Sequence, residues 1–171
     1  HDNVCAFISL DEVYKDWTKI TFKFTALASE ENSGAETIAL YFGIKQKMDG
    51  LFLDIKDVTL RNKSVVVPGP EPQKTILTSD FGSDTNWTKR GSIAYIDENS
   101  DGVNDFARLK PLSTAVAALR SAPVQIVPGE EYELTFLARI PEESKEFQTD
   151  TYNIYPEFIM YQPTLTEDGT K

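Results

Sequence analysis

Residues 131–140 read Glu-Tyr-Glu-Leu-Thr-Phe-Leu-Ala-Arg-Ile, and apolar and polar side chains alternate along most of this stretch. Every second residue from Tyr132 to Ile140 is apolar, whereas the residues between them are mostly polar or charged. Successive side chains of a β-strand point to opposite faces of a sheet, so this pattern predicts a strand with one face in the core. The helical period would not separate the two sets of side chains so cleanly.

The same two-residue period recurs along the chain and predicts further strands. The long runs are 19–25, 37–45, 51–60 and 152–161, and the shorter candidates are 5–10, 75–78, 92–97, 106–111 and 122–127. Clusters of Gly, Pro, Asn, Asp and Ser, which are typical of turns, separate these runs. Only residues 112–120 leave a choice between a strand and a short helix, because their alanines favour a helix that would be short. The pattern predicts an all-β protein, an antiparallel jelly-roll-like β-sandwich.

The composition excludes several classes of function. The 171 residues include 17 Lys and Arg and 27 Asp and Glu, and the resulting net charge of −10 disfavours nucleic acid and anionic membranes as partners. No apolar run reaches the roughly 18 residues of a membrane span, so we expect no membrane insertion. A single Cys and a single His exclude a disulfide framework and a Cys/His zinc site. Since no catalytic motif is present either, we expect that the protein is not an enzyme.

Four stretches of the chain fit a set of strand motifs. Residues 122–140 fit V-x-P-G-x-x-Y-x-L-x-F-x-A-R, and residues 77–87 are similar to L-x-N-x-D-F-E followed by Trp. Residues 17–26 are similar to W-x-x-V-x-F-x-F-T-A, and residues 52–60 to F-x-I-D-D-V-x-L. In these motifs the chain resembles carbohydrate-binding modules of the family 4/9/22 type, which are jelly-roll sandwiches. The resemblance implies a non-catalytic module of a secreted or cell-surface protein, with a polysaccharide as its partner.

The motifs stand in swapped order relative to that family. The closing half lies in residues 1–62 and the opening half in residues 74–171, with a proline-rich linker predicted at 63–73. The chain is then either one sandwich assembled from both halves or parts of two consecutive modules. Half a sandwich would expose an apolar face and unpaired strand edges, which favours the single sandwich. A single sandwich predicts pairing between residues 17–26 and strands of the second half.

Sugar binding needs aromatic platforms with polar neighbours. A pyranose ring stacks its C–H face on an aromatic ring, while amide and charged groups bond its hydroxyls. In residues 152–161, the face that alternation turns away from the core is both polar and aromatic. With outward residues of other strands, the predicted carbohydrate-binding residues are Tyr155, Tyr161, Asn153, Glu157, Arg139 and Tyr41. Pro156 indicates a sheet edge or a bulge, and the alternative role of the tyrosines is to cover such an edge or the ends of the core.

Residues 97–105 fit the pattern D-x-N-x-D-G-x-x-D of calcium-binding loops. Calcium takes about six to eight oxygen ligands, which acidic side chains in a tight turn can supply. The predicted ligands are Asp97, Asn99, Asp101, Val103 through its backbone oxygen, and Asp105. Arg108 replaces the Glu of an EF-hand, so the loop resembles the calcium loops of extracellular repeats. Structural Ca²⁺ is the expected cofactor, and a solvated acidic turn is the alternative.

The resemblance implies two further roles. Modules of this family often hold a structural calcium near their opening and closing strands, and Asp80 and Asp57 stand at the corresponding motif positions. Trp87 and Trp17 stand where the tryptophan of the family tends to be structural.

The alternative function belongs to a different class. The chain could be a structural or adhesive calcium-stabilised β-sandwich repeat of a long bacterial surface protein, without a sugar ligand. Its partners would then be the neighbouring modules of a longer chain. The acidic composition and the calcium-type loop favour this alternative.

Overall fold

The computed structural model describes residues 8–10, 15–26, 37–66, 68–69, 73–82, 86–146 and 151–159. In this part of the chain the secondary structure consists of strands and contains no helix, so no helix there could span a membrane. The strands are β1 (Ile8–Leu10), β2 (Thr18–Thr25), β3 (Thr37–Ile44), β4 (Leu53–Val66), β5 (Gln73–Ser79), β6 (Trp87–Arg90), β7 (Ile93–Ile96), β8 (Phe106–Leu109), β9 (Ala117–Ser121), β10 (Val124–Gln125), β11 (Glu131–Arg139) and β12 (Tyr152–Ile159).

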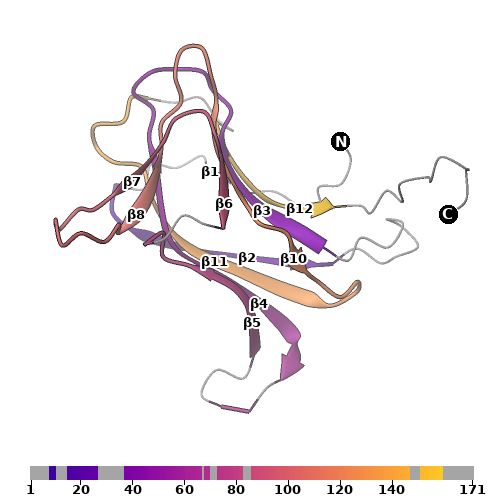
Figure 1. Ribbon diagram of the computed structural model, residues 1–171. Helices are drawn as coiled ribbons and strands as arrows, with labels where there is room; N and C mark the ends of the chain where they lie inside the picture. The colour runs from indigo at the N-terminus through magenta and orange to yellow at the C-terminus, as the bar shows by residue number, and fades with distance from the viewer. Residues whose placement is uncertain are drawn as a thin grey trace, which may run out of the picture.

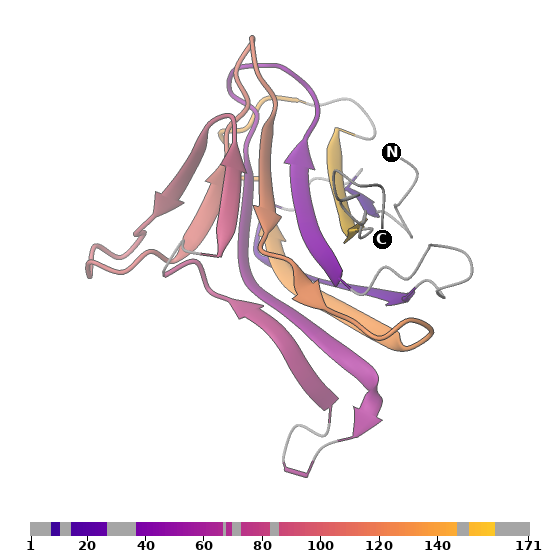
Figure 2. The ribbon, with the colours of Figure 1, turned by 45° about the vertical axis from the view of Figure 1, so that its right-hand side comes forward.

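Two antiparallel sheets pack face to face (Figures 1 and 2). Sheet A has the strand order β1-β12-β3-β9-β6, and β10 also pairs with β3. Sheet B has the order β2-β11-β4-β8-β7, and β5 also pairs with β4. The predicted fold class, an all-β antiparallel jelly-roll-like sandwich, is therefore confirmed.

The core lies between the sheets and is lined by alternate residues of the strands. In β11, Tyr132, Leu134 and Phe136 are almost completely buried, as the alternation in this strand predicts. From the opposite sheet, the ring of Phe42 meets that of Phe136 edge to face, with 5.2 Å between ring centroids. Burial of these large side chains supplies most of the stabilisation of such a sandwich.

Strands from the two sequence halves pair with one another in both sheets. In sheet B, β2 pairs with β11 along its whole length, from Thr18 opposite Ala138 to Thr25 opposite Glu131. In sheet A, β3 lies between β12 and β9. The pairing that a single sandwich predicts for residues 17–26 is thus present, while the relation to the strand order of the family stays a prediction.

Residues 63–66, predicted as the first part of a linker, belong to strand β4. Strand β4 continues to Val66, which pairs with Gln73 of β5, so β4 and β5 form a hairpin that projects at the bottom of Figure 2. The β-branched Val65 and Val66 favour extended backbone, and the described residues between the two strands are Pro68 and Gly69, which are typical of turns. The proline-rich stretch therefore contains the last residues of β4 and the connection from β4 to β5.

The ambiguous stretch 112–120 ends in strand β9. Its alanines favour a helix when the chain is considered alone, but β9 lies between β3 and β6 and pairs with both. Tertiary pairing thus overrides a weak local preference. Strand β6 has no counterpart among the predicted strands, since its residues alternate too briefly to show a period.

Pro156 lies within β12, opposite Leu40 of β3, and the pairing register there is unbroken. The N–H of Leu40 donates to Oγ of Ser121 in β9, at 2.9 Å, so the polar backbone groups of Leu40 point away from β12. The missing N–H of Pro156 therefore costs no β12–β3 hydrogen bond. Of the two predicted alternatives, a sheet edge or a bulge, the unbroken register excludes the bulge. The described residues of β1 end opposite Ile154, so no described strand pairs with β12 at Pro156 on that side, which agrees with an edge.

Candidate functional site

The face of sheet A that is turned away from sheet B carries two rows of residues that run across the strands. We call it the outer face of sheet A. The first row consists, strand by strand, of Tyr155, Tyr41, Arg120 and Thr88. The second row consists of Asn153, Gly43, Ala118 and Arg90. Strand pairing thus brings together residues that are far apart in the sequence.

Tyr41 and Tyr155 form a stacked cross-strand pair. Their ring centroids are 4.7 Å apart and their planes differ by 16°. The ring of Tyr41 also lies over Gly43, where a Cβ would be 2.5 Å from Cε1 of Tyr41, so glycine leaves the room that this ring occupies. Each ring contacts its partner and is only partly buried, so part of its surface stays accessible to solvent.

Both tyrosine hydroxyls are neutral near neutral pH. Burial raises the pKa of Tyr41, against the lowering effect of the charge of Arg90. Burial is also the main reason why the pKa of Tyr155 is raised, with a further contribution from Tyr41. Each hydroxyl therefore keeps its proton and can donate as well as accept a hydrogen bond.

An ion pair between Arg120 of β9 and Glu157 of β12 bridges the strand between them. Glu157 pairs in register with Ala39 of β3, which faces outward and yet has no exposed surface. The small side chain of Ala39 leaves room for the two long side chains to meet above it. Small residues thus form the floor of this face, and tyrosines and charged groups stand above it.

The structure gathers most of the predicted carbohydrate-binding residues. Tyr155, Asn153 and Glu157 lie on β12 and Tyr41 on the adjacent β3, all on the outer face of sheet A. Tyr161 lies outside the described residues.

The prediction that Arg139 neighbours these residues is wrong. Arg139 lies on β11, which belongs to sheet B, whereas the predicted tyrosines lie on sheet A. Alternation along a strand shows which residues face outward, but it does not show in which sheet the strand pairs. Sequence reasoning also missed Arg120 and Arg90, because the pairing of β9 and β6 that places them has no local signal.

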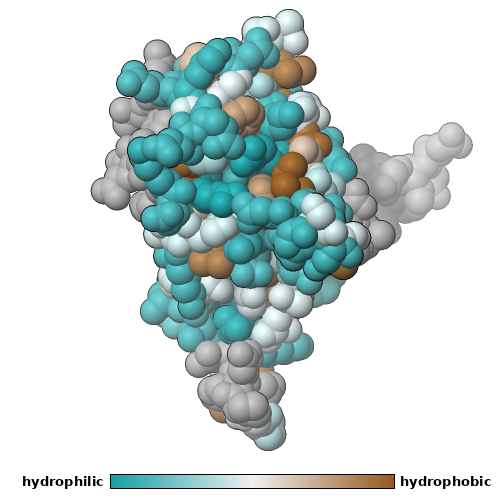
Figure 3. Space-filling view, turned by 90° about the vertical axis from the view of Figure 1, so that its left-hand side faces the viewer, coloured by the Kyte–Doolittle hydropathy of each residue, from teal (hydrophilic) through white to brown (hydrophobic). Residues whose placement is uncertain are grey.

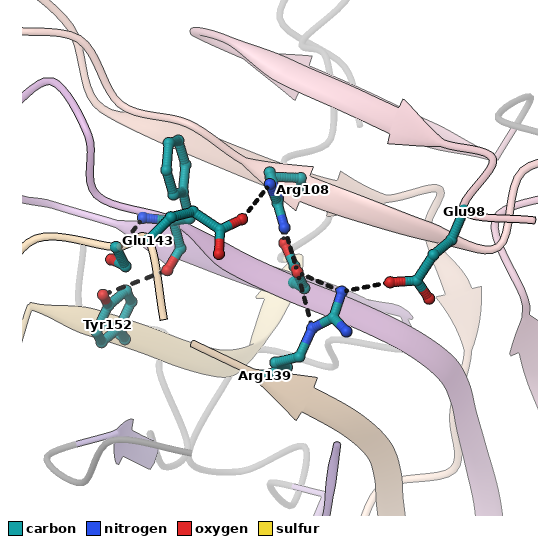
Figure 4. Close-up of polar contacts among 8 residues, drawn as sticks. Glu98, Arg108, Arg139, Glu143 and Tyr152 are labelled. Atoms are coloured by element: carbon teal, nitrogen blue, oxygen red, sulfur yellow. Dashed lines mark hydrogen bonds and ion pairs between the residues drawn. The ribbon is translucent and has the colours of Figure 1, made fainter. Parts of the chain in front are cut away.

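On the outer face of sheet B, Arg139 belongs to a chain of alternating charges (Figure 4). Its centre is Asp54, which has no exposed surface. Arg108 donates from Nε to Oδ1 of Asp54 at 2.6 Å and from Nη2 to Oδ2 at 2.8 Å. Arg139 donates to Oδ2 from Nε at 3.1 Å and from Nη2 at 3.0 Å. Glu143 and Glu98 complete the chain, with contacts of 3.0 Å to Arg108 and 3.2 Å to Arg139.

This network holds both guanidinium groups in place. The hydrogen bond to Asp54 is the main cause that raises the pKa of Arg108. A hydrogen bond from its own backbone N–H is the main cause that lowers the pKa of Glu143, helped by the charge of Arg108. Arg139 and Arg108 therefore serve the fold rather than offering charge to a ligand.

Both tryptophans are engaged in packing, in agreement with the structural role that the resemblance implies. Trp17 meets Phe106 edge to face at 5.3 Å, and the guanidinium of Arg139 lies 4.5 Å from the centroid of the Trp17 ring. Trp87 is buried and donates from Nε1 to Oγ of Ser79 at 3.0 Å.

The loop 97–105 joins β7 to β8 and is closed by its own acidic side chains. Asp97 accepts hydrogen bonds from the backbone N–H groups of Asp101 and Gly102, at 3.1 and 2.8 Å. Asn99 accepts one from Asp101 at 2.9 Å, and Asp105 accepts one from Glu98 at 2.7 Å. The oxygens predicted to bind calcium therefore already stabilise the turn without an ion.

Within the described part of the chain, no group of three or more His, Cys, Asp or Glu side chains is placed to hold a metal. Oδ1 of Asp101 accepts the N–H of Val103 at 2.8 Å, and the carboxylate of Asp80 accepts that of Gly82 at 2.9 Å. Asp57 lies in a bulge of β4 with a positive φ of 51°. Calcium at either place stays a prediction.

The side of the molecule with the β7–β8 hairpin is mostly hydrophilic, and hydrophobic residues appear on it only as separate spots (Figure 3). A recess of about 360 Å³ lies where β5 approaches β6 and β10. Its apolar lining residues are Ile76, Leu77, Trp87, Ala122, Pro123 and Val124. The predicted sugar-binding residues do not line this recess, which also has the polar lining residues Thr78, Ser79 and Asn86. The outer face of sheet A differs from it in carrying a stacked pair of tyrosines beside an ion pair.

Comparisons of the chain with protein-family models, with curated proteins and with solved structures gave no match.

Proposed function

We propose that the protein is a non-catalytic carbohydrate-binding module of a secreted or cell-surface protein, and that it binds polysaccharide on the outer face of sheet A. The observation that carries the proposal is the stacked pair Tyr41–Tyr155, which stands half-buried above small residues and beside the ion pair Arg120–Glu157. Aromatic carbon beside fixed polar groups is the combination that a sugar ring needs.

The proposed binding mode uses the free surface of the tyrosine pair. A pyranose ring stacks on the side of Tyr155 or Tyr41 that its partner leaves uncovered, and the two phenol hydroxyls bond to sugar hydroxyls. Asn153 and Glu157 flank Tyr155 on the same strand and offer an amide and a carboxylate for further hydrogen bonds. Since sheet pairing already fixes these side chains, little conformational entropy is lost on binding.

The test is retention on a panel of polysaccharides in affinity gel electrophoresis. We expect Tyr155→Ala to weaken binding about fivefold to tenfold, because one aromatic contact contributes about 1 kcal/mol. Thr21→Ala, on the exposed face of β2 in sheet B, is the matched control and should bind like the wild type. Retention that Tyr155→Ala leaves unchanged would place the sugar elsewhere.

The second candidate function is a structural or adhesive repeat whose partners are neighbouring modules. The observation that favours it is that Tyr41 and Tyr155 already cover one another and that Tyr41 covers Gly43. In that case the pair caps the sheet and needs no ligand. Absence of retention by every polysaccharide of the panel, with the protein folded, would favour this function over the first.

A further inference from the structure

The two outer faces use their arginines differently. On sheet B, Arg108 donates from all three of its nitrogens to Asp54 and Glu143. Arg139 donates from Nε and Nη2 to Asp54 and from Nη2 to Glu98. On sheet A, the ion pair of Arg120 in the described part of the chain uses Nε alone, toward Glu157. The buried carboxylate of Asp54 thus engages both of these arginines, whereas Arg120 on sheet A donates to Glu157 from Nε and keeps its two Nη groups for a further partner.

Arg90 is the second arginine on this face. It is exposed and makes no ion pair with any side chain that the structure describes. It pairs in register with Ala118, which faces outward next to Gly43 and is almost completely buried beneath longer side chains. The charge of Arg90 reaches the hydroxyl of Tyr41, since it is one of the influences on the pKa of that group. Arg90 and the outer nitrogens of Arg120 thus border the tyrosine pair.

Resting on the proposed function, we propose that the outer face of sheet A selects a polysaccharide that carries carboxylates at intervals along an otherwise neutral chain. A uronate carboxylate is bound by Arg90 and by the Nη groups of Arg120, while a neighbouring sugar ring stacks on Tyr155 and Tyr41. The planar guanidinium matches a carboxylate with two parallel hydrogen bonds, which fixes the orientation of the sugar.

The net charge of −10 of the protein limits how densely charged a ligand of this face can be. A chain with an anion on every unit, such as a nucleic acid, is repelled by the protein as a whole. A carboxylate that stands alone among neutral sugars interacts mainly with the charges within about 8 Å of it, because salt screens the others. The positive charges of Arg90 and Arg120 outnumber the negative charge of Glu157 near the tyrosine pair, so the local interaction with a single carboxylate is attractive.

The experiment compares polysaccharides that differ only in their carboxylates. Glucuronoxylan and xanthan are used in affinity gel electrophoresis, each before and after chemical reduction of its uronates to neutral sugars. Arg90→Gln removes one positive charge from the proposed site. Lys19→Gln removes one positive charge from the exposed face of β2 in sheet B and is the control. Dextran sulfate serves as a densely charged anion that offers sulfate in place of carboxylate.

We expect at least one native polysaccharide to bind about tenfold more tightly than its reduced form. Arg90→Gln should remove most of that difference and leave binding of the reduced form unchanged, while Lys19→Gln behaves like the wild type. Equal retention of native and reduced forms, or retention by neutral polysaccharides alone, overturns the inference and leaves the proposed function standing. Retention that is stronger on dextran sulfate than on the uronate polysaccharides, and that Tyr155→Ala leaves unchanged, also overturns the inference. The protein would then bind anions without recognising a sugar. Absence of retention on every polysaccharide overturns the proposed function itself.

Discussion

At the residue scale, two buried polar groups carry consequences that can be measured. Asp54 is completely buried, and its carboxylate is the common partner of two arginines. Tyr152 is likewise completely buried, and its hydroxyl donates to the backbone oxygen of Phe52 at 3.4 Å. The alternation of the sequence predicts that Tyr152 faces the core, but it does not predict that Asp54 is buried, because Asp54 faces outward and is covered only by its partners.

Asp54→Asn should destabilise the protein by about 3 kcal/mol, because it leaves two guanidinium groups beside one another without their shared negative charge. Glu143→Gln is the matched control, since Glu143 is exposed at the end of the same network and its loss should cost less than about 1 kcal/mol. Urea unfolding measures both changes. Equal effects of the two substitutions would mean that Asp54 is not the centre of the network.

Tyr152 makes stability sensitive to alkali. Burial raises the pKa of Tyr152 to about 12, above its ordinary value of 10.0. Above about pH 10 the unfolded state loses the phenol proton while the folded state keeps it, so the folded state binds more protons and stability falls as pH rises toward 12. Between about pH 8 and pH 12, the free energy of unfolding of Tyr152→Phe should therefore fall by about 2 kcal/mol less than that of the wild type. Urea unfolding at a series of pH values measures this difference. The same alkaline loss in both proteins would contradict this account.

At the element scale, the long strands were predictable and their partners were not. Residues 131–140 and 19–25 show a clear two-residue period, and both are strands. Strand β6 and the strand at the end of 112–120 depend on pairing with distant segments, which leaves no local signal. The candidate site was predictable to the same extent. The outward position of Tyr155 and Tyr41 follows from alternation. The presence of Arg120 and the absence of Arg139 depend on which sheet a strand joins, and alternation does not show this.

The loop between β7 and β8 gives a prediction at this scale. If residues 97–105 bind calcium as an extracellular loop does, about 5 mM Ca²⁺ should raise the melting temperature by several degrees relative to chelator. Asp101→Asn should abolish most of that rise, and Asp16→Asn, an exposed acidic residue outside the loop, should not. An unchanged melting temperature of the wild type would mean that the loop is the solvated acidic turn that its own hydrogen bonds describe.

At the scale of the whole molecule, both sheets are built from both halves of the chain. Strands β2, β3 and β4 each pair with β11 or β12 of the second half. Fragments 1–68 and 69–171, cut in the β4–β5 turn, should each lack cooperative unfolding and should regain the β-sheet circular dichroism spectrum when mixed. Two fragments that unfold cooperatively on their own would indicate parts of two modules.

The proposed binding of polysaccharide to the outer face of sheet A can be located residue by residue. The most direct test is a titration of the isotope-labelled protein, followed by backbone amide NMR, with oligosaccharides from the polysaccharide that retains it best. We expect chemical-shift changes that concentrate on β12, β3 and β9 around Tyr155, Tyr41 and Arg120, with the signals of sheet B unchanged. Shifts confined to sheet B or to the recess beside Trp87 would contradict it.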